Sequence, residues 1–245
     1  MDSMIFIDAR EGVSGDMLLA AMIGLLDRDK RQDAIKRLTR ASEEQGLGFK
    51  LLELEDQGEA GLGITYLQPE PASHGVSYDE AFELLEKIER DLGPSSDTGR
   101  KILESIFKAE AEAHGAPARQ VHLHEMGRPQ AMMNIAGIGM LASELLAEGA
   151  QGFSCSTITT GKGIVVVSHG AVRVPAPATA ILLKGLRHEP GLDPGERATP
   201  TAIAAIKVLA SSQTDKPPQK FSKRSVGYGT KRFGDRLGRT VLIWP

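Results

Sequence analysis

The densest set of chemically active side chains lies in residues 121–127, VHLHEMG. His122, His124 and Glu125 fall close together in a chain that has six histidines. In an extended strand alternate side chains share a face, so His122 and His124 would converge on one ion or phosphate. Neutral imidazoles suit nickel, zinc and copper, and a neighbouring carboxylate adds an oxygen ligand. The motif therefore predicts a metal site or, with equal weight, a polar strand end whose histidines bond to backbone and water.

A second group of candidate residues lies near the N-terminus. Asp8 ends a short apolar run that predicts a buried strand, and a loop through Gly15 leads into a helix expected over residues 17–26. Ser14 or Asp16 would cap this helix, and the free N–H groups at a helix N-terminus favour an anion. Because Asp8 and Asp16 are themselves negative, we expect a divalent cation to bridge them to a phosphate. The alternative is a capped helix whose dipole Asp16 complements.

Two later segments offer further anion contacts. Thr199 or Thr201 would cap a helix expected over residues 203–209, and either hydroxyl can also bond a phosphate. His169 ends an expected strand just before a stiff proline-containing segment, which we expect to form a wall beside a pocket.

A glycine-containing basic turn, residues 227–232 (GYGTKR), is expected between the last two strands. There the backbone amides of Gly227 and Gly229, with Lys231 or Arg232, would contact a phosphate. The alternative is a solvated hairpin.

The positioning elements follow from hydrophobic periodicity and from glycine and proline breakers. Further helices are expected over residues 31–45, 77–92, 97–114, 129–146 and 178–183. Strands are expected over residues 49–55, 63–68, 121–125, 153–160, 164–167, 221–229 and 240–244, the first two as a hairpin. This alternation predicts the α/β class, with a mixed sheet, covering helices and some antiparallel hairpins. We expect a single domain over residues 1–245, with a helical subdivision near residues 70–120 as the alternative.

The composition narrows the class of protein. The chain has 245 residues, of which 41% are hydrophobic and 25% charged, with a net charge of −3. Few aromatic residues and no positive excess argue against nucleic-acid binding. A single cysteine excludes an internal disulfide, and no apolar run approaches the roughly 20 residues that span a bilayer. We expect a soluble, cytoplasmic protein that binds neither nucleic acid nor membranes and forms a homo-oligomer.

The separated motifs, taken together, resemble the LarC family of nickel-insertion proteins over essentially the whole chain. The matching motifs are residues 8–17, 122–127, 168–170, 174–179, 199–201 and 227–230. The resemblance implies a role in making the nickel-pincer nucleotide cofactor, in which nickel is inserted into a pyridinium bisthiocarboxylate mononucleotide by CTP-dependent cyclometallation. It therefore implies nickel, CTP with Mg²⁺ or Mn²⁺, a nucleotide-like ligand and, if the chain is active, a lyase-type cyclometallase component.

We assign residue roles within that expectation from side-chain chemistry. The expected metal ligands are Asp8, Asp16, His122 and His124. The expected catalytic residues are His124, Glu125 and His169. The expected ligand-binding residues are Ser14, Gly15, Thr199, Thr201, Gly227 and Gly229.

The chain departs from the family pattern in places that bear on activity. Where the family reads GAVDSIVD, residues 127–134 read GRPQAMMN, so Gln130 and Asn134 replace two aspartates. Amides neither balance a divalent cation nor take a proton near neutral pH. The first loop also carries Arg10 and Glu11, where the family favours a small or aromatic pair.

Family members continue into a C-terminal domain associated with CTP and nickel, so we expect a separate partner chain of that type. The competing interpretations are a catalytically silent paralogue, acting as a nucleotide- or partner-binding scaffold, and a metal-dependent phosphohydrolase.

Overall fold

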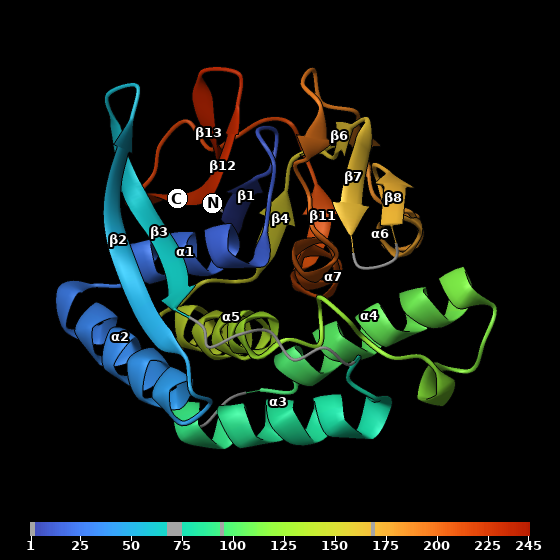
Figure 1. Ribbon diagram of the computed structural model, residues 1–245. Coiled ribbons are helices and arrows are strands. Elements are labelled where there is room, and N and C mark those ends of the chain that lie inside the picture. Colours follow the sequence, from blue (N-terminus) through green and yellow to red (C-terminus); the bar gives the residue numbers. More distant parts are fainter. Residues whose placement is uncertain (1–2, 68–74, 94–95, 168–169) are drawn as a thin grey trace.

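A computed structural model describes residues 3–67, 75–93, 96–167 and 170–245. Its described residues form a mixed seven-stranded sheet with helices stacked against one face (Figure 1). In order across the sheet, the strands are β11 (Ala210–Gln213), β4 (Phe153–Cys155), β1 (Ile5–Asp8), β13 (Arg236–Trp244), β12 (Lys223–Phe233), β3 (Glu59–Leu67) and β2 (Gly48–Asp56). β1, the third strand in this order, runs parallel to β4 and antiparallel to β13. The expected α/β class is confirmed.

The remaining strands pair in a hairpin at one edge of the sheet and in short two-stranded pairs outside it. β2 and β3 form the antiparallel hairpin that the sequence predicts, and β12 joins it in parallel through Gly227 and Tyr228. Short two-stranded pairs lie outside the main sheet: β5 (Ile158–Thr159) with β9 (His188–Glu189), β6 (Gly161–Lys162) with β10 (Gly195–Glu196), and β7 (Ile164–Val167) with β8 (Gly170–Arg173). The strand expected over residues 153–160 is therefore broken into β4 and β5.

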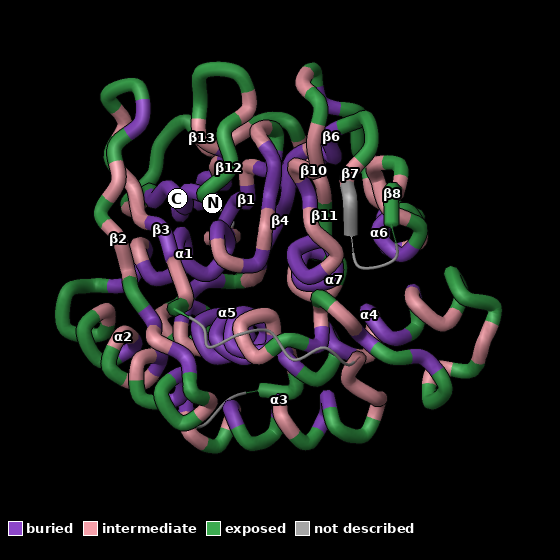
Figure 2. Tube along the Cα trace, in the orientation of Figure 1, coloured by how far each residue is buried: buried purple, intermediate pink, exposed green. Residues whose placement is uncertain are grey.

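The helices are α1 (Gly15–Leu25), α2 (Arg28–Glu43), α3 (Tyr78–Leu92), α4 (Thr98–His114), α5 (Pro129–Ala147), α6 (Pro177–Leu182) and α7 (Pro200–Leu209), with a 3-10 turn η1 (Ala118–Gln120). α1 is apolar around almost its whole circumference because it lies between the sheet and α5 (Figures 1 and 2). α3 opens with a capping box in which Ser77 and Glu80 satisfy each other's backbone N–H groups. No helix in the described ranges is both long and apolar enough to cross a bilayer.

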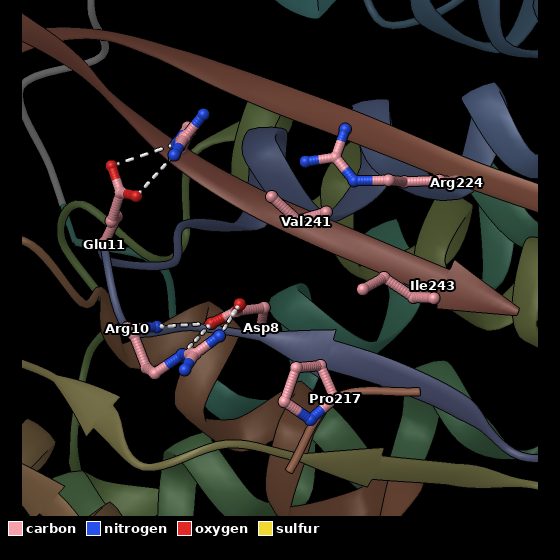
Figure 3. A pocket seen from close by; sticks show the side chains of 8 residues that line it. Asp8, Arg10, Glu11, Pro217, Arg224, Val241 and Ile243 are labelled. Atoms are coloured by element: carbon pink, nitrogen blue, oxygen red, sulfur yellow. Dashed lines mark hydrogen bonds and ion pairs between the residues drawn. The ribbon is translucent and has the colours of Figure 1, made fainter. Parts of the chain in front are cut away.

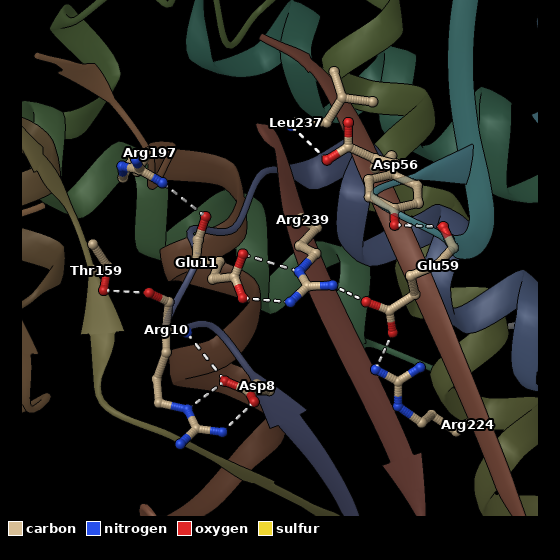
Figure 4. A network of polar contacts seen from close by, with 11 residues as sticks. Asp8, Arg10, Glu11, Asp56, Glu59, Thr159, Arg197, Arg224, Leu237 and Arg239 are labelled. Carbon is tan, nitrogen blue, oxygen red and sulfur yellow. Dashed lines mark hydrogen bonds and ion pairs between the residues drawn. The ribbon is translucent and has the colours of Figure 1, made fainter. Parts of the chain in front are cut away.

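The two faces of the sheet are covered differently. The main core cluster lies on the helix side and includes residues of α3 and α4, so the helices near residues 70–120 share it. The opposite face holds a smaller cluster made of strand residues, including Phe6, Val241 and Ile243. Long arginine side chains lie over this face (Figure 4), because Arg239 follows the same alternation as Val241 and Ile243.

An ion-pair network crosses that arginine-covered face. Arg239 donates to both carboxylate oxygens of Glu11, at 3.0 Å from Nε and 2.5 Å from Nη2, and also pairs with Glu59. Glu59 in turn pairs with Arg224 of β12 (Figure 4). The network ties the loop after β1 to three strands that follow it in the sheet.

The prediction of a strand around His122 is wrong. Among the described residues, an isolated bridge between Val76 and Leu123 is the only pairing there, and the chain then turns toward α5. Gly127 permits this turn, since a Cβ atom on it would lie 2.6 Å from the Leu123 carbonyl oxygen. The alternation still holds locally, because Leu123 is buried whereas His122 is exposed.

The prediction of a basic turn at residues 227–232 is also wrong. These residues belong to β12, and the chain reverses later, at Gly234 and Asp235, between β12 and β13.

Candidate functional site

Two helix N-termini are held side by side by a parallel bridge between Val13 and Ala198. The Val13 amide donates to the Arg197 carbonyl oxygen at 2.7 Å, and the Thr199 amide donates to the Val13 carbonyl oxygen at 3.0 Å. The next residue of each segment is an N-cap: Ser14 for α1 and Thr199 for α7. The bridge thus places the first turns of α1 and α7 next to each other.

Neither N-cap side chain accepts a hydrogen bond from a backbone N–H group of its own helix. The Ser14 hydroxyl donates instead to Asp16 Oδ1 at 2.5 Å, and Thr199 Oγ1 is buried without a hydrogen-bond partner in the described part of the chain. The N–H groups of a first helical turn have no partner within the helix, and they carry the positive end of the helix dipole. Two such turns in one place suit an anion.

Small residues permit this close approach. A Cβ atom on Gly15 would lie 3.0 Å from Thr201 Cγ2 and 3.3 Å from Asn134 Cβ. Gly15 and the buried Thr201 therefore form the contact between the two helices. Gly227 lies beneath α1, where a Cβ atom would meet the Met17 carbonyl oxygen at 1.9 Å. Three of the predicted ligand-binding residues therefore serve packing contacts: Gly15, Gly227 and, through its side chain, Thr201.

A bulge in β12 supplies the third wall. The register between β12 and β13 shifts between Tyr228 and Arg232, so Gly229, Thr230 and Lys231 fall outside the regular ladder. Bulges of this kind often re-aim side chains next to binding sites. Lys231 lines the same cavity as the two N-caps, whereas Arg232 does not, because it pairs with Asp56 at 2.9 Å.

We call this cavity, of about 150 Å³, the twin-cap pocket. Its polar lining comes from Ser14, Asp16, Glu196, Arg197, Thr199, Thr230 and Lys231. Sites that enclose a drug-sized ligand measure roughly 300–1,000 Å³. The twin-cap pocket therefore fits an anionic group such as a phosphate, and the remainder of a nucleotide would extend outward.

The charges of the pocket are balanced in sign. Arg197 is engaged by Asp193 at 2.7 Å and lies over the Phe233 ring at 4.0 Å, whereas Lys231 is exposed. Burial raises the pKa of Glu196, the charge of Glu125 raises it further, and Lys231 opposes both. Glu196 therefore gives up its proton at a higher pH than an ordinary glutamate.

No residue of the histidine motif lines the pocket, and the motif acts on it through the charge of Glu125, which raises the pKa of Glu196. His122 and His124 both lie against Gly75: a Cβ atom there would be 2.9 Å from His122 Cβ and 3.0 Å from His124 Cε1. The side chains of His122 and His124 thus both lie next to Gly75, although the expected strand does not form.

Asp8 is not brought to this place. It lines a different cavity of about 270 Å³, with Arg10 beside it and Val241 and Ile243 along it (Figure 3). Both of its carboxylate oxygens accept hydrogen bonds from Arg10, at 2.8 Å and 2.5 Å. The cause is strand alternation, since Asp8 shares the face of Phe6, away from the helices.

Within the described ranges no three His, Cys, Asp or Glu side chains come together as a metal-binding group. The composite centre of Asp8, Asp16, His122 and His124 is therefore not assembled in this part of the chain. His169 lies outside the described residues.

Two features escaped the sequence analysis. Glu196 sits in a polar loop rich in proline and glycine, which reads as solvated until the β6–β10 pairing is seen. The Tyr66 hydroxyl donates to Asn134 Oδ1 at 2.9 Å, next to Gly15, and burial followed by the charge of Asp16 raises the Tyr66 pKa.

These observations define a class of protein: an α/β protein with a candidate anion pocket between two helix N-termini and a bulged strand. A family profile described as Nickel insertion protein matches residues 5–241, and the chain belongs to that family. No solved structure matches the chain.

Relatives named for nickel insertion include a Pelobacter propionicus protein, 30% identical over 96% of this chain and 58% of its own length. A Rhodopirellula baltica protein is 31% identical over 94% of this chain and 56% of its own length. The Staphylococcus epidermidis "Pyridinium-3,5-bisthiocarboxylic acid mononucleotide nickel insertion protein" is 32% identical over 95% of this chain and 57% of its own length. The chain thus spans less than three fifths of these relatives.

Proposed function

We propose that this chain is a component of a nickel insertase and that the twin-cap pocket holds the phosphate of its nucleotide substrate. The observation that carries the proposal is the convergence of Ser14, Thr199 and Lys231 on one phosphate-sized cavity. The name of the Staphylococcus epidermidis relative supports the substrate class, since a mononucleotide has one phosphate for such a pocket to bind.

Nickel enters this proposal as a substrate. His122 and His124, on one side of Gly75, would hold it as two neutral imidazole ligands. Two imidazoles leave other coordination positions open, and the sulfur atoms of a bisthiocarboxylate are soft ligands that suit them. Glu125, which follows His124 directly and whose charge acts on Glu196, remains our candidate for the group that accepts a proton.

The described residues do not fit a resident Mg²⁺ or Mn²⁺ ion with CTP. The carboxylate of Asp8 is paired with Arg10, and the carboxylate of Asp16 accepts a hydrogen bond from Ser14. Gln130 and Asn134 carry neutral amides. Hard divalent cations prefer several carboxylate or carbonyl oxygens. We therefore propose that a separate partner chain binds Mg·CTP. The cytoplasmic location and homo-oligomeric state are likewise proposals.

Lys231→Met tests the phosphate site. We expect its affinity for nicotinate mononucleotide, a pyridinium mononucleotide, to fall at least about tenfold, because a charge-assisted hydrogen bond contributes about 1.5–3 kcal/mol. Isothermal titration calorimetry measures this, and Lys220→Met, an exposed lysine outside the pocket, is the matched control. Equal affinity of Lys231→Met and wild type would refute the phosphate assignment.

A nucleotide-binding scaffold is the second candidate function. The amides at Gln130 and Asn134 favour it, because Asn134 already accepts the Tyr66 hydroxyl and neither amide adds negative charge. This reading predicts that the mononucleotide binds the twin-cap pocket while Ni²⁺ gives no heat of binding in the same calorimeter.

A further inference from the structure

We propose that Glu196 binds the substrate's phosphate through a shared proton and is a specificity-determining residue of the twin-cap pocket. The inference rests on the proposed function, because it needs an anion in that pocket. It adds that the pocket takes an anion together with one proton.

The backbone around Glu196 is held firmly. Gly195 and Glu196 of β10 pair with β6, and the following Arg197 amide donates to the Thr160 carbonyl oxygen at 3.0 Å. Gly161, with φ of 87°, approaches so closely that a Cβ atom on it would lie 2.0 Å from the Gly195 carbonyl oxygen. Two residues further on, Ala198 forms the bridge to Val13 that sets the pocket. Glu196 is therefore a fixed part of the pocket wall.

Three charged residues line the pocket together with this half-buried carboxyl: Lys231 from the bulge of β12, Asp16 from α1 and the adjacent Arg197. Glu125 of the histidine motif acts on it through its charge, and Lys162 of β6 pairs with the neighbouring Gly195. The Arg197 guanidinium already forms an ion pair with Asp193 and stacks over the ring of Phe233. Desolvation and Glu125 favour the neutral form of Glu196, against Lys231.

A neutral carboxyl changes what the pocket can bind. An ionised Glu196 would repel a phosphate dianion, whereas a carboxylic acid donates a hydrogen bond to it. A phosphate monoester has a second pKa near 6, so it can also bring the proton itself. Both routes give the same complex, in which one proton lies between a carboxyl oxygen and a phosphate oxygen.

The sign of the pH effect follows from this proton count. Binding that takes up a proton weakens as pH rises above the pKa values of both free partners. Inorganic phosphate titrates in this range, whereas sulfate does not, so sulfate reports the titration of Glu196 alone.

The test measures the affinity of the full chain for inorganic phosphate and for sulfate at pH 6 and pH 8.5. Wild type is expected to lose at least about tenfold in affinity for both anions across this interval. Glu196→Gln cannot ionise, so its sulfate affinity should stay constant and its phosphate affinity should hold or rise as the dianion forms. Glu189→Gln, an exposed glutamate of β9 outside the pocket, should behave as wild type.

The outcomes separate this inference from the proposed function. Anion binding whose pH dependence is the same in wild type and Glu196→Gln overturns the role of Glu196 and leaves the phosphate pocket standing. Absence of phosphate binding in wild type at both pH values overturns both. Thermal unfolding of Glu196→Gln at the same pH values shows that the variant is folded.

Discussion

Gly227→Ala is expected to destabilise the protein by about 3 kcal/mol or more, at the upper end of the cost of overpacking a core. The new Cβ atom would lie 1.9 Å from the Met17 carbonyl oxygen and 2.9 Å from the Ala21 amide nitrogen. Both are backbone atoms of α1, so they move only if the helix moves, and the first turn of that helix forms the twin-cap pocket. Chemical denaturation monitored by circular dichroism measures the loss.

Gly229→Ala is the matched control on the same strand. Its Cβ atom would lie 3.0 Å from the Met17 sulfur, the end of a flexible side chain that can turn aside. We expect a change below about 1 kcal/mol for this variant. A Gly227→Ala protein that unfolds at the wild-type denaturant concentration would show that α1 does not rest on β12 as described.

His122→Ala and His124→Ala are each expected to weaken Ni²⁺ binding at least about tenfold, or ~1.4 kcal/mol. Each substitution removes one of two imidazoles that share a side of Gly75, so the chelating pair becomes a single ligand. The double variant should show no Ni²⁺ binding by calorimetry. His188→Ala, an exposed histidine of β9, should keep the wild-type affinity.

Unchanged Ni²⁺ affinity in the double variant would remove nickel from the histidine motif. The scaffold interpretation would then be favoured, provided that the mononucleotide still binds.

Local features of the site were predictable from the sequence. The apolar run before Asp8, the loop through Gly15 and the apolar stretch of α1 predict a strand, a turn and a helix, and all three are confirmed. Thr199 also stands at the N-cap position, as expected. These signals are local, because the periodicity of hydrophobic residues and the type of capping residue can be read from neighbouring positions in the sequence.

Long-range features were not predictable. The bridge from Val13 to Ala198 joins segments far apart in the chain, and the hydrophobic periodicity of the sequence does not predict such a pairing. Alternation shows that Asp8 shares a face with Phe6, but only the fold shows that the helices cover the other face. The residues around Leu123 alternate as a strand would, yet within the described ranges their pairing is limited to the bridge with Val76.

The most direct test of the central claim follows backbone amides by two-dimensional ¹⁵N–¹H NMR while inorganic phosphate is added. The account predicts that the amides of Asp16 and Met17 in α1 and of Thr201 and Ala202 in α7 shift together with one dissociation constant. Shifts confined to one helix, or centred on the Asp8 and Arg10 cavity, would contradict it.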